Sequence, residues 1–285
     1  MSCLDDFAQY PPEWCPGCGN FDLLDCLKQA LCDLGLQPHE IINVIGIGQA
    51  SKLGFSLKCN MFDGLHGRAL PVVLGIKMAN PAVKVIATSG DGCFYAEGGN
   101  HFIHNLRRNL DVAILASDNR VYGLTKGQAS PTSASDFKTK VHIEGVGALP
   151  LNPAALALVS GATFVARTFT GAKAEATELI KKALLHRGAA VIDIMSPCVS
   201  FNKVNTFAWF RQRAKPIGPD HDVTDLHAAL KLAFHDDEHI PTGVLYQTRR
   251  PVFGDHLTVM QGESIVQRTL RFTPDRVRPL FKDFY

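Results

Sequence analysis

The fold is decided by residues 85–132, which read VIATSGDGCFYAEGGNHFIHNLRRNLDVAILASDNRVYGLTKGQASPT. A short apolar run enters Gly-Asp-Gly at 90–92, an amphipathic segment containing Phe102 and Leu106 follows, and a second apolar run ends at Asp118-Asn119. This order predicts strand, loop, helix, strand and loop. Polar groups then follow both strands, at the edge where open parallel sheets bind their ligands.

Asp91 and Asn119 are therefore expected to lie side by side. A carboxylate, an amide oxygen and a backbone carbonyl are hard donors that suit a Mg²⁺ ion completing its shell with a diphosphate. Gly90 and Gly92 let the backbone approach such a ligand closely. A lone Gly-Asp-Gly is more often a plain turn. The motif becomes a more specific indication of a metal site because an Asn follows the next strand. The pair resembles the thiamine diphosphate-binding motif of thiamine-dependent enzymes.

Length and composition indicate an ordinary globular chain. The 285 residues are 46% hydrophobic and 20% charged, and this length fits one large α/β domain or two small ones. We favour one domain over 1–285 and expect a mostly parallel sheet with helices on both faces. We expect the core to span about 15–202. The pattern weakens beyond it, so 203–285 is expected to be an extension that packs on the core or on a partner subunit. Further strands are predicted at 41–45, 164–167, 189–195 and 243–246, and helices at 21–34, 71–78, 156–160, 173–186 and 222–234.

Charge and hydropathy narrow the class of protein further. A net charge of +2 gives no reason to expect a nucleic-acid partner. The apolar runs are shorter than the ~20 residues of a membrane span, and the N-terminus lacks the features of a signal peptide. A cytoplasmic protein is the default expectation, and in that compartment the eight cysteines are not expected to form disulfides.

The segment 11–20 contains a Cys-Pro-Gly-Cys turn that points the thiols of Cys15 and Cys18 at one spot. Three readings stay open: half of a zinc site, a thioredoxin-like redox pair, and part of an iron–sulfur cluster. No second zinc-type pair occurs at zinc-ribbon spacing, no strand precedes the motif, and a cluster needs two further thiolates from elsewhere. Cys26 and Cys32 fall in a predicted helix and are expected to be core or surface thiols.

Two more loops carry groups that could bind an anion. The run at 41–45 leads into Gly46-Ile47-Gly48, whose backbone N–H groups can cradle phosphate, although a tight turn explains the pattern equally. Lys52 is the cation of that loop, and either a carboxylate contact or a solvated surface position fits it. His66 and Arg68 flank a glycine ahead of a predicted helix and offer a second anion contact.

Taken together, six motifs resemble the β subunit of the 2-oxoacid:ferredoxin oxidoreductases. They are Cys-Pro-Gly-Cys-Gly-Asn at 15–20, Gly-Ile-Gly-x-x-x-Lys at 46–52, Leu-His-Gly-Arg-Ala at 65–69, Gly-Asp-Gly at 90–92, the block at 122–132, and Ser-Pro-Cys at 196–198. The block at 122–132 is the most specific of them. The resemblance implies a thiamine diphosphate-binding fold that supplies the diphosphate half of the site, while a separate α subunit supplies the pyrimidine half.

The resemblance also assigns residues. Asp91, Asn119 and the backbone carbonyl of Val121 would hold Mg²⁺. The loops that would line the cofactor contribute Gly46, Gly48, His66, Gly90, Gly92, Tyr122, Gly123 and Leu124.

One [4Fe-4S] cluster is implied as well, and Cys15, Cys18 and Cys198 match three of its ligands. The chain departs from the family at Gln49, where many members have the fourth cysteine, and an amide oxygen is a poor ligand for iron. We expect Cys59 to supply the fourth thiolate, with a three-thiolate cluster as the alternative. Cys93 follows Gly92 directly and is expected to lie too close to the magnesium site.

The implied reaction is the CoA-dependent, reversible oxidative decarboxylation of a 2-oxoacid to an acyl-CoA and CO₂, with electrons passing through the cluster to ferredoxin. Lys52 and Lys126 match loops near the substrate in the family. Two lysines suit a dicarboxylate, so 2-oxoglutarate is favoured over pyruvate or a broad range of 2-oxoacids.

Two other classes remain as alternatives. A cluster-free thiamine-dependent decarboxylase would keep Asp91 and Asn119 but leave Cys15, Cys18 and Cys198 unexplained. The second alternative is a binding or assembly module stabilised by zinc, in which Gly-Asp-Gly is only a turn. This alternative requires the several family-like motifs to occur together by coincidence. Iron and zinc analysis separates the three.

Overall fold

The structure is a computed structural model that describes residues 3–234, 238–262, 264–268, 271 and 273–282. An eight-stranded sheet runs through it in the order β2-β1-β3-β4-β6-β5-β8-β7. The strands are β1 (Ile41–Ile45), β2 (Asn60–Asp63), β3 (Lys84–Gly90), β4 (Val112–Asp118), β5 (Phe164–Phe169), β6 (Ala189–Met195), β7 (Ala214–Pro216) and β8 (Ile240–Gln247).

The sheet is mostly parallel. Strands β2, β1, β3, β4, β6 and β5 pair in parallel, and β8 pairs antiparallel with β5 and carries the short β7. The predicted α/β class is confirmed. Every residue of β4 and β6 is buried, as expected for strands covered on both faces.

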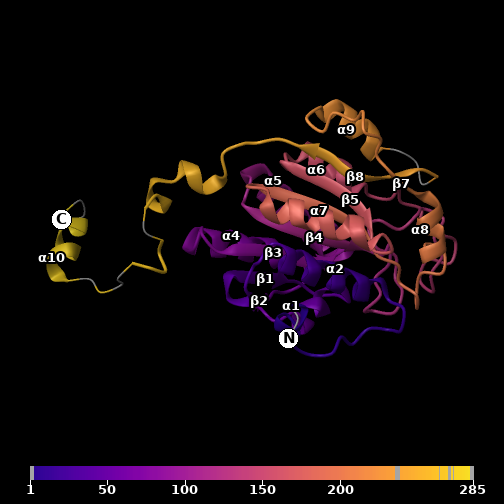
Figure 1. Ribbon diagram of the computed structural model, residues 1–285, viewed down its shortest axis with the longest axis horizontal. Helices are drawn as coiled ribbons and strands as arrows, with labels where there is room; N and C mark the ends of the chain where they lie inside the picture. The colour runs from indigo at the N-terminus through magenta and orange to yellow at the C-terminus, as the bar shows by residue number, and fades with distance from the viewer. Residues whose placement is uncertain (1–2, 235–237, 263, 269–270, 272, 283–285) are drawn as a thin grey trace.

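Helices cover both faces of the sheet (Figure 1). One face packs against α2 and α7, and the other packs against α4, α5, α6 and α9. Residues of β4 alternate accordingly, with Ala113 and Leu115 facing α2 and α7 and Ile114 and Ala116 facing the other layer. The helices are α1 (Cys3–Asp6), α2 (Gly19–Asp33), α3 (Leu53–Ser56), α4 (Ala69–Ala79), α5 (Gly99–Arg108), α6 (Pro153–Val159), α7 (Lys173–Leu185), α8 (Phe207–Arg213), α9 (Leu226–Ala233) and α10 (Pro274–Val277).

The parallel register sets the position of the site. Gly90 at the end of β3 pairs with Ser117 near the end of β4, and β1 ends at Ile45 directly before the first glycine loop. After β3 the chain enters a π-helical turn, Gly92–Glu97, a geometry found disproportionately at functional sites. The glycine-rich loops and the polar strand ends therefore share one edge of the sheet.

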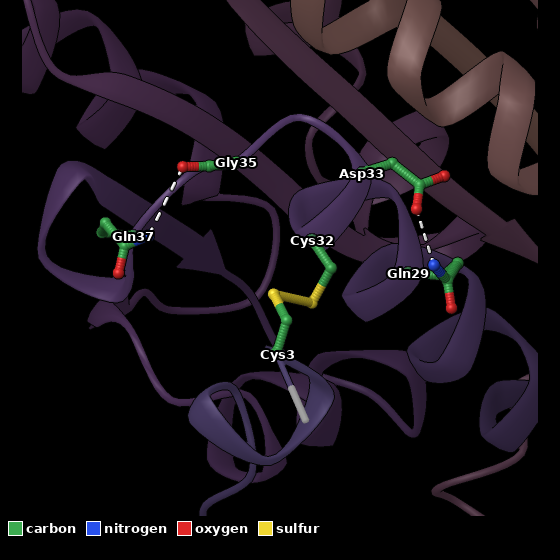
Figure 2. The surroundings of a disulfide bond; sticks show 6 residues. All are labelled: Cys3, Gln29, Cys32, Asp33, Gly35 and Gln37. Carbon is green, nitrogen blue, oxygen red and sulfur yellow. Dashed lines mark hydrogen bonds between the residues drawn. A yellow bond between two sulfur atoms is a disulfide. The ribbon is translucent and has the colours of Figure 1, made fainter. Parts of the chain in front are cut away.

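A disulfide between Cys3 and Cys32 joins α1 to the last turn of α2, which corrects the expectation that no cysteines pair (Figure 2). Their Cα atoms lie 5.7 Å apart, within the usual range for a disulfide. The prediction rested on cellular compartment, whereas pairing depends on proximity. The short α1 packs back on α2, so two cysteines 29 positions apart in sequence come together. No spacing pattern in the sequence predicts that contact. The other six cysteines are free.

The segment beyond residue 202 has two parts. Strand β8 and helix α9 belong to the sheet and its covering layer, since Leu245, Ala229 and Ala233 lie in the main core, so the core extends past the expected boundary. After β8 the chain first runs along the body, where the Asn109 side chain donates to the Arg250 and Pro251 carbonyls and Arg187 pairs with Asp255. Farther on, Figure 1 shows α10 standing well away from the sheet. Within the described part of the chain, no helix is both long and apolar enough to span a bilayer.

Candidate functional site

Two buried carboxyl groups and one hydroxyl form the centre of the carboxyl edge. The hydroxyl of Thr132 lies 2.6 Å from Oδ2 of Asp91 and 2.7 Å from Oδ1 of Asp118. Burial raises the pKa of Asp91 to about 8, and the neighbouring charge of Asp118 adds to the rise. One hydroxyl has a single proton to donate, so it cannot serve both carboxylates at once. A divalent cation at this point would stabilise the ionised acids.

The turn after β4 is held by its own side chains. Asn119 Oδ1 accepts a hydrogen bond from the Val121 N–H at 3.0 Å, and Asp118 Oδ1 accepts one from Arg120 N–H at 3.0 Å. Arg120 has a φ of 56°, a left-handed conformation that is uncommon outside glycine and often found at functional sites. Asn202 donates to the Asn119 carbonyl at 3.0 Å. The turn therefore holds the Asn119 side chain in a fixed position at the carboxyl edge of the sheet.

Glycines at the strand ends are required by close approach. A Cβ on Gly92 would overlap the Tyr122 ring, and a Cβ on Gly46 would overlap the Cys93 sulfur. Gly48 differs, because its φ of 139° disfavours other residues while the space beside it is open. The loop after β1 therefore has room for a ligand against its backbone.

His66, Glu97 and Tyr122 form a polar wall at the π-helical turn. The Tyr122 hydroxyl donates to Glu97 Oε1 at 3.0 Å. Nδ1 of His66 lies 3.1 Å from Glu97 Oε2 without an aligned hydrogen bond, which leaves that nitrogen without a directed partner among the described residues. Burial raises the pKa of Tyr122, and Glu97 raises it further, so the phenol stays a donor.

Three of the four cysteines assigned to the cluster line one pocket together with Gln49. Cys15 is exposed at its rim, Cys18 and Cys198 are half-buried, and the Cys18 N–H donates to the Cys15 carbonyl at 3.0 Å. Burial raises the pKa of Cys18 to about 11, and the nearby thiols of Cys198 and Cys15 contribute. The three cysteines lie close enough to influence one another.

The pocket between these thiols is narrow. It has about 20 Å³ of free space, and no three His, Cys, Asp or Glu side chains of the described residues are already arranged as a metal site. Cys15, Pro16 and Gly17 are exposed, so the cysteine loop borders solvent on one side.

Hydrogen bonds to two backbone carbonyls fasten the cysteine loop to the sheet edge. The Trp14 indole N–H donates to the Gln49 carbonyl at 2.7 Å, which ties the loop to the turn after β1. The Gly19 N–H donates to the Pro197 carbonyl at 3.2 Å, which ties it to the segment after β6. These bonds hold Cys15 and Cys18 close to Cys198, which lies 180 positions after Cys18 in sequence.

Gly123 joins the cysteine pocket to the polar centre. A Cβ on Gly123 would lie 3.5 Å from the Cys198 sulfur, 3.7 Å from Cγ of Gln49 and 3.9 Å from Nδ2 of Asn119. One small residue therefore separates a thiol of the cysteine group from an amide of the proposed magnesium site. Leu124, next to it, is 42% exposed.

The structure does not bring Cys59 to this group. Cys59 immediately precedes β2, whose first residue Asn60 pairs with Ile42 near the start of β1. Because the strands are parallel, Cys59 lies at the amino edge of the sheet, opposite the edge that carries Cys198. Burial raises the pKa of Cys59 to about 11, and a hydrogen bond with the backbone of Asn43 partly offsets that rise. The expectation of a fourth thiolate from Cys59 is corrected on this ground.

The two lysines occupy different surroundings. Lys52 lines a pocket of about 440 Å³ with Phe55 and lies 3.4 Å from the Glu13 carbonyl. Lys126 is exposed, with a φ of 76°, in the loop closed by pairing of Tyr122 with Gln128.

Sequence reasoning gave no role to Thr132, Glu97 or Asn202. Thr132 falls within the most specific motif block, so that block held a signal for it. Glu97 and Asn202 act through contacts that only the folded chain creates.

Two family models match the chain. The model for the thiamine pyrophosphate enzyme C-terminal TPP-binding domain matches residues 47–194, and the model for the C-terminal part of the pyruvate ferredoxin oxidoreductase β chain matches 198–262. The first contains Gly48, Asp91 and Asn119, and the second contains Cys198.

Characterised relatives and a solved structure agree with these models. The β subunit of 2-oxoacid:ferredoxin oxidoreductase 2 from Aeropyrum pernix is 39% identical, over 87% of this chain and 84% of that one. The 2-oxoglutarate oxidoreductase subunit KorB of Mycobacterium tuberculosis is 42% identical, over 66% of this chain and 51% of that one. A 2-oxoglutarate:ferredoxin oxidoreductase from Magnetococcus marinus, solved with 2-oxoglutarate, coenzyme A and succinyl-CoA bound, superposes with a TM-score of 0.92 at 35% identity, over 99% of this chain and 96% of that one.

Proposed function

Because the chain belongs to the β subunits of the 2-oxoacid:ferredoxin oxidoreductases, we propose that it combines the diphosphate half of a thiamine site with an iron–sulfur cluster. The reaction we propose is the reversible conversion of 2-oxoglutarate and CoA to succinyl-CoA and CO₂, with two electrons passing to ferredoxin and one proton released. When bound, thiamine diphosphate supplies the nucleophilic carbon and the electron sink for decarboxylation.

Magnesium fits the donors at the carboxyl edge. Asp91 provides a carboxylate, Asn119 an amide oxygen with a free lone pair, and Val121 a backbone carbonyl, all hard oxygen ligands. The crowded contact of Asp91 and Asp118 through one hydroxyl supports a cation here, because the ion would neutralise both acids.

The diphosphate would lie against the glycine loops. Gly48 offers backbone beside open space, and Gly46, Gly90, Gly92 and Gly123 keep side chains out of the way. His66 and Tyr122 would bind or orient the cofactor from the side, and exposed Leu124 would contribute apolar surface.

Two lysines support a dicarboxylate substrate. Lys52 and Lys126 are the cations in the loops that flank the glycines, and each could hold a carboxylate at its own end of a substrate such as 2-oxoglutarate. Relatives named for 2-oxoglutarate favour the same substrate.

An α subunit, together with CoA and ferredoxin, completes the proposed assembly, which we place in the cytoplasm. Among the described residues after Gly262, the apolar side chains of Ile265, Val266, Leu280 and Phe281 are exposed, which suits contact with the α subunit. Truncation after Gly262 should leave the β subunit folded and weaken its co-purification with α. Equal co-purification would remove the tail from that interface.

The observation that carries the proposal is the position of Gly123 between Cys198 and Asn119. The test is anaerobic co-purification with the α subunit, followed by analysis of iron, thiamine diphosphate and 2-oxoacid-dependent electron transfer. We expect iron and the cofactor in one complex. Cofactor binding without iron would instead support a cluster-free decarboxylase.

A further inference from the structure

Gln49 is a polar residue in the wall of the three-cysteine pocket. It lines the pocket with Cys15, Cys18 and Cys198, and its side chain lies on the same side of Gly123 as the Cys198 sulfur. Its Oε1 is buried and has no hydrogen-bond partner among the described residues. A buried amide oxygen without a partner costs free energy, which points to a group that contacts it when the site is filled.

The fold fixes this position. The Gln49 carbonyl accepts from the Trp14 indole, and its backbone leads directly into the 3₁₀ turn Ala50–Lys52. Trp14, which precedes Cys15 in sequence, thereby anchors the Gln49 backbone next to the cysteine loop.

No other cysteine is placed to replace it. The Cys93 sulfur accepts from the Gly67 N–H at 3.3 Å and packs against Gly46, and Cys26 is buried beside α7, where its sulfur contacts the Lys173 carbonyl at 3.5 Å. Cys3 and Cys32 are joined to each other, and Cys59 lies at the opposite edge of the sheet. All eight cysteines are thus accounted for.

We propose that the cluster of this protein is held by three thiolates, from Cys15, Cys18 and Cys198, and that its fourth iron faces the amide of Gln49. This inference rests on the proposed function, because it takes the cysteine pocket to hold a cluster. An amide oxygen binds iron far more weakly than thiolate does. The iron beside Gln49 is therefore exchangeable, and an external thiol can bind it.

The chemical consequence is a defined oxidation. One-electron oxidation by ferricyanide converts [4Fe-4S]²⁺ into [3Fe-4S]⁺ and releases one Fe²⁺, while ferricyanide is reduced to ferrocyanide. No cysteine ligand is lost, so Fe²⁺ and a one-electron reductant restore the original cluster.

The test compares anaerobically prepared αβ complex containing wild type, Gln49→Cys, Gln49→Ala or Cys59→Ser. Each is titrated with ferricyanide, and EPR and protein-bound iron are followed. We expect wild type to give the three-iron signal with loss of about one iron in four, and Gln49→Cys to resist this loss by at least about tenfold. Gln49→Ala should convert at least as readily as wild type, and Cys59→Ser should behave as wild type does.

The outcomes separate the inference from the proposed function. Four irons retained equally by wild type and Gln49→Cys would overturn the inference while leaving a cluster in place. Loss of iron in Cys59→Ser would also overturn it, by identifying a fourth thiolate. Absence of iron from every complex would overturn the proposed function, and the inference with it. If Gln49→Cys fails to assemble, the ferricyanide conversion of the cluster and its restoration by Fe²⁺ can still be measured in wild type and Gln49→Ala. A cluster that does not convert in either protein would overturn the inference.

Discussion

Among single residues, Asp91 is the group on which the proposed magnesium site depends most. It is buried, it follows the strand end directly, and it shares the Thr132 hydroxyl with Asp118. An isolated carboxylate in this position would be strongly disfavoured. Under the proposed function, its presence at the carboxyl edge would be explained by a cation that binds there with the cofactor.

Replacing Asp91 by Asn should abolish magnesium-dependent cofactor binding. The amide keeps the size of the side chain but removes the charge, so we expect affinity for thiamine diphosphate to fall at least about 100-fold. Calorimetric titration of the αβ complex with Mg²⁺ and thiamine diphosphate measures the effect. Asp220→Asn, at an exposed turn, is the matched control and should bind as wild type does. Unchanged affinity in Asp91→Asn would remove this residue from the site.

Gly92→Ala should displace Tyr122, because the added methyl group would overlap its ring. We expect the protein to stay folded, with weakened cofactor binding and a changed tyrosine signal in near-UV circular dichroism. The control is Gly75→Ala, in an exposed part of α4 with nothing near the added methyl, which should stabilise the fold by about 0.5–1 kcal/mol. Identical binding by wild type and Gly92→Ala would contradict the close packing described here.

The buried His186 should make stability sensitive to acid. Burial lowers its pKa below the usual value, and its Nε2 lies 2.8 Å from the Thr163 hydroxyl. The unfolded chain therefore binds more protons than the folded chain below about pH 6.5, so the free energy of unfolding falls as pH falls through that range. Urea unfolding between about pH 7 and pH 5 should show a shallower decline in His186→Gln. Parallel declines would exclude this histidine as a cause.

The sequence predicted which strand ends carry the candidate residues better than it predicted their contacts. Asp91, Asn119 and the glycines could be identified because each follows an apolar run that becomes a buried strand. Cys59 was chosen for its nearness in sequence to Gln49, and this failed because a parallel strand, β2, begins beside it and sends it to the far edge. The contacts of the Thr132 hydroxyl could not be predicted. A polar loop without a regular pattern returns Thr132 to the ends of β3 and β4, and the sequence does not indicate the course of that loop.

Among the helices and strands, elements with strong apolar periodicity were predicted within a few residues. Strand β2 was missed because all four of its residues are exposed and carry no apolar alternation. Helix α9 begins at Leu226 instead of 222 because the Asp225 carboxylate accepts from the N–H groups of His227 and Ala228 and caps it there. Such ends are decided by single hydrogen bonds.

The link between α1 and α2 should contribute to stability without affecting the site. The disulfide closes a loop of 29 positions, so the loop-entropy model predicts about 3.6 kcal/mol of stabilisation. Cys3→Ser should lower the free energy of unfolding by roughly 2–4 kcal/mol in urea, and cofactor affinity should stay unchanged. Wild type treated with a reductant is the control and should match the variant. No difference between oxidised and reduced protein would contradict this role.

For the molecule as a whole, the sheet edge brings two kinds of chemistry together. Loops after β1, β3 and β4 carry the glycines and oxygen donors, and the N-terminal loop and the segment after β6 carry the thiols. Gly123 lies between the two groups. The sequence could indicate both sets separately, and the parallel topology explains why they meet, since every contributing strand ends at the same edge.

The most direct test of the proposed function is ferredoxin reduction by the anaerobic αβ complex supplied with 2-oxoglutarate. We predict that ferredoxin is reduced, with CO₂ released, only when thiamine diphosphate, Mg²⁺ and CoA are all present, and that pyruvate is a poorer substrate. The complex containing Asp91→Asn should be inactive under every condition. Release of CO₂ with no electrons reaching ferredoxin would contradict the proposed function.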